Sequence, residues 1–141
     1  MKIPQNITIF GDTEFRGVCP TEGAELMTLV STVKAKYPGV ILIHQKNEGR
    51  RTWRQASVDK SIGALDKGAS DIVLIGYSNM CCLFIELKRK DHTKSIINDE
   101  QIEYLRRAYD MGHLSCVALG YEAALQAIDS WVNGELNDFL I

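Results

Sequence analysis

Two acidic residues and a lysine have the types and the spacing of a hydrolytic site. Asp71 opens an apolar run at residues 72–75, and Glu86 and Lys88 stand at alternate positions in a second run that begins at residue 81. Side chains on a β-strand repeat every two residues, so Glu86 and Lys88 share one face of a strand. A divalent cation held by the two acids would polarise a phosphate oxygen and lower the pKa of bound water, and the lysine would orient the nucleophile or stabilise developing negative charge. The three residues therefore indicate hydrolysis of a phosphodiester bond.

The two apolar runs flank a turn-like segment, residues 76–79, and predict an antiparallel β-hairpin. If the turn is centred between Ser78 and Asn79, Asp71 lies opposite Glu86 with Cβ atoms about 4.5–5.5 Å apart, where like charges destabilise the pairing. A cation between the two carboxylates would remove that repulsion, and oxygen ligands suit Mg²⁺ or Mn²⁺ better than Zn²⁺. We therefore expect a magnesium or manganese site on this hairpin.

Taken singly, each of these residues has an ordinary structural explanation. An aspartate at the start of a strand is often a turn residue, and a Glu-Leu-Lys step is often the solvated face of a strand. Glu86, however, interrupts a run so apolar that both faces of the strand look covered, and burying an unpaired charge is costly. Considered together, the two acids and the lysine favour a functional site.

The order of these residues resembles the PD-(D/E)xK nuclease motif, and the flanking sequence resembles its VRR-NUC branch, the virus-type replication-repair nucleases. The motif is carried by residues 68–71 (GASD, with Ser70 where proline is usual) and 84–88 (FIELK). The flanking resemblance is carried by residues 47–50 (NEGR), Gln101 and residues 117–120 (VALG), followed by Ala123 and Ala124. The resemblance spans residues 21–131, most of the chain.

The resemblance implies a fold, an activity and a set of roles. The fold is an α/β restriction-endonuclease-like mixed sheet flanked by helices, with an αβββαβ core, and the activity is that of a Mg²⁺- or Mn²⁺-dependent DNA endonuclease. Lys88 would orient the attacking water with support from Gln101. Small stand-alone members resemble Holliday junction resolvases, which implies branched DNA as substrate and a homodimer with two symmetric active sites. The implied metal ligands are Asp71, Glu86, Glu22 and the backbone carbonyl of Leu87.

Residues 21–37 predict the helix that carries Glu22. The helix ends before Pro38, and its apolar stripe at helical spacing is formed by Leu26, Leu29, Val30, Val33 and Tyr37. At about 100° per residue, Glu22 lies close to the centre line of this stripe and Glu25 lies to its side. The helix dipole alone explains a glutamate in a first turn. Because the resemblance implies an acid from this helix in the metal site, we assign Glu22 and keep Glu25 as the alternative.

Gln101 also has two explanations. Residues 98–101 have a helix-start signature, in which Asn98 is the N-cap and Gln101, three residues on, is its reciprocal capping partner. The resemblance instead gives Gln101 a place in the active site. The sequence leaves capping and catalysis open.

Two basic segments predict contacts with DNA. The first follows a predicted strand at residues 40–44, surrounds Trp53, and continues into a predicted helix at residues 55–67; the second comes directly after Lys88. Cations beside an aromatic residue can contact phosphates and stack on a base, although a solvated loop is the ordinary alternative. The residues expected to bind DNA are Asn47, Arg50, Arg51, Arg54, Lys60 and Lys67 in the first segment, and Arg89, Lys90 and Lys94 in the second.

The whole chain predicts a nuclease-like domain at residues 21–141, preceded by an extension at residues 1–20 that could form a hairpin and either cap the sheet or join a partner subunit. Further elements are expected as a helix after Asn98, a strand at 115–119 and a helix at 122–131.

The net charge of −2 requires a nucleic-acid partner to be met by a local basic patch. Four cysteines without C-x-x-C spacing read as reduced core thiols, and no segment has the length of a membrane span. We expect a cytoplasmic protein without a membrane partner.

Two other classes of function remain open on this sequence. One is a non-catalytic DNA-binding protein that retains the nuclease fold. The other is a structural or adaptor protein whose charged strand face is merely solvated, which would bind neither metal nor, in a salt-dependent manner, DNA.

Overall fold

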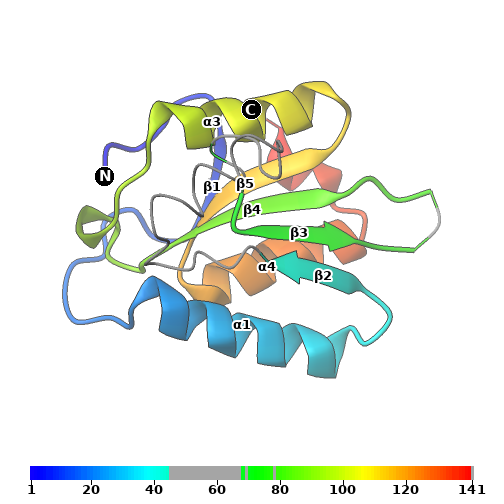
Figure 1. The fold of residues 1–141 in the computed structure, drawn as a ribbon, viewed down its shortest axis with the longest axis horizontal. Helices are drawn as coiled ribbons and strands as arrows, with labels where there is room; N and C mark the ends of the chain where they lie inside the picture. Colours follow the sequence, from blue (N-terminus) through cyan, green and yellow to red (C-terminus); the bar gives the residue numbers. More distant parts are fainter. Residues whose placement is uncertain (45–67, 69, 78, 141) are drawn as a thin grey trace, which may run out of the picture.

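The computed structural model describes residues 1–44, 68, 70–77 and 79–140. It is a five-stranded mixed sheet with helices on both faces (Figure 1), in the strand order β1-β5-β4-β3-β2. β1 and β4 pair with β5 in parallel, and the remaining pairs are antiparallel. The elements in chain order are β1 (Thr8–Phe10), α1 (Glu22–Lys36), β2 (Ile41–His44), β3 (Ile72–Ile75), β4 (Leu83–Lys88), η1 (His92–Lys94), α3 (Asp99–Asp110), β5 (Leu114–Leu119), α4 (Tyr121–Val132) and η2 (Leu136–Phe139). The predicted α/β class and the order of the αβββαβ core are confirmed.

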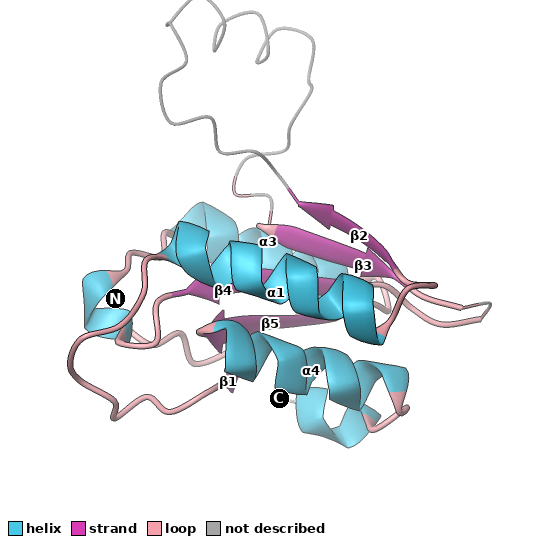
Figure 2. Ribbon diagram, turned by 90° about the horizontal axis from the view of Figure 1, so that it is seen from below, coloured by secondary structure: helices cyan, strands magenta, loops and turns pink. Residues whose placement is uncertain are grey.

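The helices form one layer on each face of the sheet (Figure 2). α1 and α4 pack with alternate residues of β3, β4 and β5 in the larger core, to which Leu29 contributes from α1 and Ile128 from α4. α3 packs on the opposite face through Leu105, which lies in a second cluster with Val117 and Leu119 of β5. All six residues of β5 are buried, as expected for a strand covered on both faces. None of the helices in the described residues is long and apolar enough to cross a membrane.

The predicted hairpin forms with the expected register. Ile72 pairs with Ile85 and Leu74 with Leu83, so the next position along each strand sets Asp71 opposite Glu86. Alternate apolar side chains of this hairpin are buried in the larger core, namely Ile72, Leu74, Leu83, Ile85 and Leu87. A one-residue slip would turn every side chain to the other face of the sheet, so this burial fixes the register.

The N-terminal segment differs from the predicted hairpin. Its strand β1 pairs in parallel with β5 at the edge of the sheet, and the expected return strand at residues 14–16 is absent from the structure. Instead, Asp12 closes a local turn, in which its side-chain Oδ1 accepts from the amide of Glu14. Beyond this turn the chain runs to the β4–α3 connection, where the amide of Gly17 donates to Asp91. The hairpin prediction was wrong because long-range contacts outcompete a second strand.

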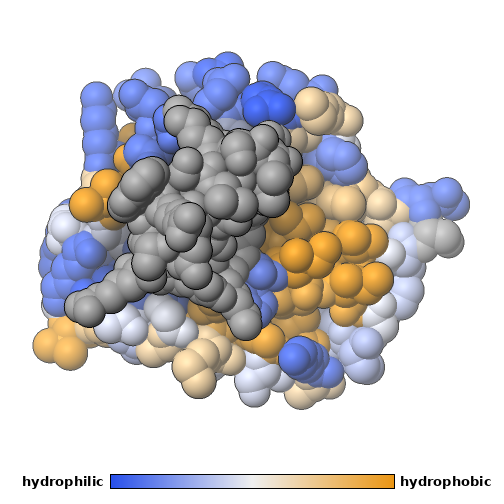
Figure 3. Space-filling view, viewed as in Figure 1, coloured by the Kyte–Doolittle hydropathy of each residue, from blue (hydrophilic) through white to orange (hydrophobic). Residues whose placement is uncertain are grey.

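The strand predicted at residues 40–44 forms as β2. It is the outer strand of the sheet, and Ile41 and Ile43 are exposed together with Ile75 of β3. These side chains contribute to the hydrophobic area over β2 and β3 in Figure 3. A β-branched run predicts a strand but does not specify its place in a sheet. The predicted helix at residues 55–67 and the first basic segment lie outside the described residues.

Candidate active site

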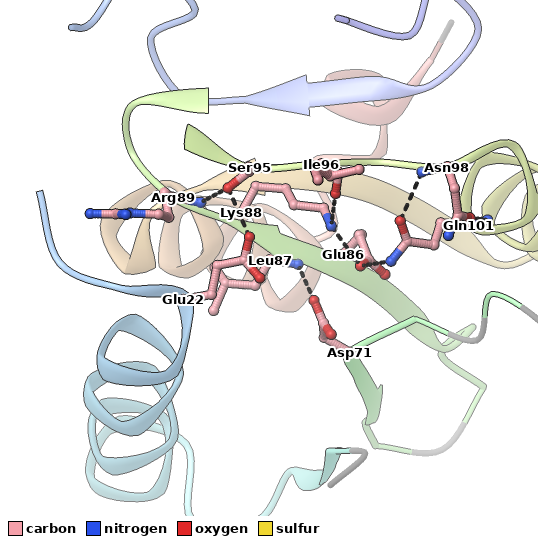
Figure 4. Close-up of polar contacts among 10 residues, drawn as sticks. All are labelled: Glu22, Asp71, Glu86, Leu87, Lys88, Arg89, Ser95, Ile96, Asn98 and Gln101. Carbon is pink, nitrogen blue, oxygen red and sulfur yellow. Dashed lines mark hydrogen bonds and ion pairs between the residues drawn. The ribbon is translucent and has the colours of Figure 1, made fainter. Parts of the chain in front are cut away.

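Asp71 and Glu86 enter the site from two neighbouring strands (Figure 4). Asp71 stands immediately before β3, and its Oδ2 accepts a hydrogen bond from the Leu87 amide of β4 at 2.9 Å. This bond fixes one oxygen of the Asp71 carboxylate beside the strand that carries Glu86. The sequence prediction that these two acids lie together is therefore met by the fold.

Gly68 allows the chain to reach Asp71 beside α3. Its φ is +71°, and a Cβ built on it would lie 2.3 Å from the backbone carbonyl group of Glu100. A residue with a side chain is strained at this φ and would collide with the backbone at the start of α3. The glycine thus sets the approach of the Asp71 segment to the helix that carries Gln101.

Glu86 is 1 % exposed and only one of its oxygens has hydrogen-bond partners. Glu86 Oε1 accepts from Gln101 Nε2 at 2.7 Å and lies 3.2 Å from Lys88 Nζ. Glu86 Oε2 is buried and has no partner in the described residues. An unpaired buried carboxylate oxygen is costly, so this atom is available for a ligand that supplies positive charge.

The surroundings raise the pKa of both acids. Burial and then the negative charge of Asp71 raise the pKa of Glu86 to about 8, against the opposing effect of Lys88. Burial also raises the pKa of Asp71, while the hydrogen bond from the Leu87 amide and the charge of Lys88 lower it. Without a cation, the pair therefore holds a proton near neutral pH. A divalent cation would favour the ionised form of both groups.

Lys88 is held between the site and the loop that follows it. Its Nζ donates to the Ile96 carbonyl at 2.6 Å as well as contacting Glu86, and the residue is only 4 % exposed. An ammonium has three donors. Among the described residues, Glu86 and Ile96 account for two of them, so one N–H is left with which Lys88 could meet a phosphate or a nucleophile.

The structure shows that Gln101 caps α3 and also contacts Glu86, whereas its catalytic role stays a prediction. Its Oε1 accepts from the Asn98 amide at 3.0 Å, and the Asn98 side chain accepts from the Gln101 amide, which completes the capping box of α3. Because Oε1 is engaged in this way, the Gln101 side chain turns its Nε2 donor toward Glu86. The Gln101 side chain therefore both caps the start of α3 and contacts the Glu86 carboxylate.

The two glutamates of α1 lie differently from the helical-wheel prediction. Glu25 is the more buried of the two, and its Oε2 accepts from the Tyr121 amide at the start of α4 at 2.5 Å. Glu22 is half-buried, and its Oε1 accepts from Ser95 Oγ at 2.8 Å. The prediction that Glu22 points further inward was wrong because α1 packs on α4 as well as on the sheet. Glu25 is hydrogen-bonded to the first residue of α4, whereas Glu22 lies next to the candidate site, at the loop that follows Lys88.

A metal ion is compatible with the acid pair, although a complete ligand set is not assembled. In the described part of the chain, no group of three or more His, Cys, Asp or Glu side chains is arranged to hold a metal ion. The unpaired Glu86 Oε2 and the neighbouring Asp71 nevertheless provide the hard oxygen donors that Mg²⁺ prefers. Glu22 and the Leu87 carbonyl stay predicted ligands.

The second basic segment makes intramolecular contacts. Arg89 donates to the carbonyls of Cys19 and Pro20, and Lys94 donates to the carbonyl of Gly17. The Nζ of Lys90 lies 4.6 Å from the centroid of the Phe15 ring. The sequence showed the charges of Arg89, Lys90 and Lys94 without showing these partners, which come from the N-terminal segment. The contact of Lys90, Lys94 and the six residues of the first segment with DNA stays a prediction. For Arg89, the predicted DNA contact competes with its two bonds to the N-terminal segment, and the two roles predict different effects of Arg89→Met on DNA affinity.

Residues 95–98, which follow the second basic segment, make contacts with the site residues that the sequence did not predict. Ser95 contacts Glu22, the Ile96 carbonyl contacts Lys88, and the Asn98 amide contacts Gln101. Two of these contacts use backbone atoms, which carry no residue-type signal. The third uses an ordinary serine, and only its position next to the motif could have drawn attention to it.

The comparisons with known proteins give one informative likeness. No family model matches the sequence, and no curated protein matches it. Among solved structures, the chain is similar to a "VRR_NUC domain protein", with a TM-score of 0.63 at 17 % sequence identity, over 84 % of this chain and 92 % of that one. At this identity the likeness concerns the fold. The chain therefore has the fold of a VRR_NUC domain protein, the same group that its motif residues resemble.

Proposed function

We propose that this protein is a metal-dependent DNA endonuclease of the VRR-NUC type. The observation that carries the proposal is the acid pair with its buried glutamate: half-buried Asp71 lies opposite buried Glu86 on two neighbouring strands, Glu86 Oε2 has no partner in the described residues, and Lys88 lies beside Glu86. A merely solvated strand face would not bury an acid at 1 % exposure next to a lysine at 4 %. The fold shared with a VRR_NUC domain protein supports the same conclusion.

In this proposal, each residue of the site has a separate role in metal binding or catalysis. Asp71 and Glu86, with Glu22 and the Leu87 carbonyl, would hold Mg²⁺ or Mn²⁺. When bound, the cation polarises the phosphate and lowers the pKa of a bound water. Lys88 directs its remaining N–H toward the nucleophile or toward developing negative charge. Gln101 holds Glu86 Oε1, so that Glu86 Oε2 stays turned to the ligand.

The substrate proposed is branched DNA, a Holliday junction or a related structure, and the active form proposed is a homodimer. Two symmetric sites are needed to cut opposed strands of a four-way junction. Light scattering should then give about twice the chain mass of 15.8 kDa. A monomer that does not distinguish a junction from linear duplex would instead indicate a simpler nicking enzyme.

The decisive experiment is a cleavage assay on a four-way junction and on a linear duplex of matched sequence, with Mg²⁺, with Mn²⁺ and with a chelator. We expect cleavage with either metal, none with chelator, and a preference for the junction. If the protein binds DNA in a salt-dependent manner but does not cleave it with any metal, the proposed endonuclease activity is wrong and a non-catalytic DNA-binding protein is favoured. If DNA binding is also absent, a structural or adaptor role takes its place.

A further inference from the structure

The hydroxyl of Ser95 joins the end of β4 to the first turn of α1, next to the candidate site (Figure 4). Ser95 Oγ accepts from the Arg89 amide at 2.9 Å and donates to Glu22 Oε1 at 2.8 Å. A hydroxyl has a single proton. Because the Arg89 amide occupies the acceptor side of the oxygen, that proton is directed to the carboxylate of Glu22.

This hydroxyl is fixed on both sides. Ser95 is buried at 5 % exposure, and its backbone amide donates to the carbonyl of His92, the first residue of η1. Arg89 is held as well, since its guanidinium donates to the carbonyls of Cys19 and Pro20 just before α1 begins. Two sets of contacts thus connect the start of α1 to the end of β4. In one set the Arg89 guanidinium binds the carbonyls before α1, and in the other the Ser95 hydroxyl binds the Glu22 side chain.

Glu22 needs such a tie because it comes from the other face of the sheet. Gln101 belongs to α3 on one face, whereas α1 packs on the opposite face with α4. Glu22 lies beside Leu87 and Lys88 at the end of β4 (Figure 4), and its negative charge contributes to the raised pKa of Asp71. A half-buried glutamate in a first helical turn would otherwise be free to turn to solvent.

We propose that Ser95 is a positioning residue, whose hydroxyl holds the Glu22 carboxylate toward Asp71 and Glu86. This inference rests on the proposed nuclease function and extends it to a residue outside the recognised motif. Charge-assisted hydrogen bonds are strong where water is excluded, and outer partners of metal ligands typically change metal affinity by 10–100-fold. Ser95 would act on the metal through Glu22 alone, so its effect depends on that carboxylate.

The test is a calorimetric titration of the full chain with Mn²⁺, which does not depend on cleavage. We expect Ser95→Ala to bind Mn²⁺ about tenfold more weakly and Ser95→Thr, which keeps the hydroxyl, to restore most of the affinity. Thr93→Ala is the matched control: Thr93 Oγ1 donates to Asp91 in the same loop, and in the described part of the chain Thr93 makes no hydrogen bond to a site residue. Its Mn²⁺ affinity should equal that of the unmodified chain.

A double-mutant cycle separates positioning from a general effect on folding. Glu22→Gln should weaken Mn²⁺ binding at least as much as Ser95→Ala, and adding Ser95→Ala to Glu22→Gln should produce no further loss. Equal affinity in Ser95→Ala and the unmodified chain, or additive losses in the double variant, would overturn the positioning role. If Ser95→Ala does not fold, unchanged affinity in Glu22→Gln overturns it. An unmodified chain that binds no Mn²⁺ would remove the proposed function itself, and this inference with it.

Discussion

Gln101 donates from Nε2 to Glu86 Oε1 across 2.7 Å while its own Oε1 caps the start of α3. One amide therefore connects a helix terminus to a buried acid of the site. Because the capping bond uses the oxygen end, the donor end can point only at Glu86. The contact has consequences for both stability and activity, and the two can be separated by mutation.

Gln101→Ala should lower both the melting temperature and the cleavage rate, whereas Asn98→Ala should lower mainly the melting temperature. Loss of an N-cap side chain costs about 0.5–2 kcal/mol, and Asn98 contacts Gln101 but not Glu86 through its side chain. Thermal unfolding and single-turnover cleavage on the same samples would make the comparison. Equal loss of cleavage in both variants, at equal loss of stability, would leave Gln101 with capping alone.

Asp71→Asn should keep the fold and remove cleavage. Asparagine can still accept the hydrogen bond from the Leu87 amide through its side-chain oxygen, whereas it removes the charge that would attract the cation. We expect a melting temperature close to that of the unmodified chain and a loss of Mn²⁺ binding in calorimetry. Junction cleavage at the unmodified rate by this variant would contradict the assignment of Asp71 to the site.

The stability of the metal-free protein should fall as the pH rises from about 5 to about 8. The pKa of Glu86 is about 8 in the folded chain, above its ordinary 4.5, so the folded state holds a proton that the unfolded state releases. The contribution of the neutral acid is complete below pH 4.5 and is lost as the pH passes through 8. One retained proton gives a slope of about 1 kcal/mol per pH unit.

Denaturant unfolding in chelator across this pH range would measure that slope. Glu86→Gln, which is neutral at every pH, should flatten the curve and abolish cleavage at the same time. A slope in Glu86→Gln equal to that of the unmodified chain would show that the proton is bound elsewhere.

Gly68→Ala should be much more destabilising than Gly112→Ala. Both glycines have positive φ, +71° and +93°, but a Cβ at Gly68 would lie 2.3 Å from the Glu100 carbonyl group, whereas nothing lies within 4 Å at Gly112. Gly112→Ala thus carries the backbone strain alone, about 1–3 kcal/mol, and Gly68→Ala adds a collision with α3. Chemical denaturation of both variants would test this, and equal midpoints would refute the close approach.

Arg89 and the arginines of the first basic segment should differ in their effect on DNA binding. Arg89 is bound to the carbonyls of Cys19 and Pro20, so Arg89→Met should lower stability and leave the salt dependence of DNA affinity nearly unchanged. Removing a phosphate contact, as expected for Arg50→Ala or Arg51→Ala, reduces the log–log salt slope by about 1. The measurement is DNA affinity at several salt concentrations. A reduced slope in Arg89→Met would assign it to the DNA surface.

The sequence by itself determined the acid pair and the hairpin that holds it. The alternation of β4, the turn between the strands and the place of Asp71 before its apolar run are local features, and local patterns fix which residues of a hairpin face each other. The start of α3 at Asn98 was predictable for the same reason, since a capping box lies within four consecutive residues.

Only the tertiary structure bound Glu25 to the start of α4, joined β1 to β5, and turned Arg89 toward the N-terminal segment. Each of these outcomes depends on contacts between segments far apart in the chain, such as the 96 positions between Glu25 and Tyr121. A helical wheel describes one stripe on an isolated helix, whereas α1 faces both the sheet and α4. The partners of such charged side chains are therefore determined by the packing of distant segments, and the local sequence pattern does not predict them.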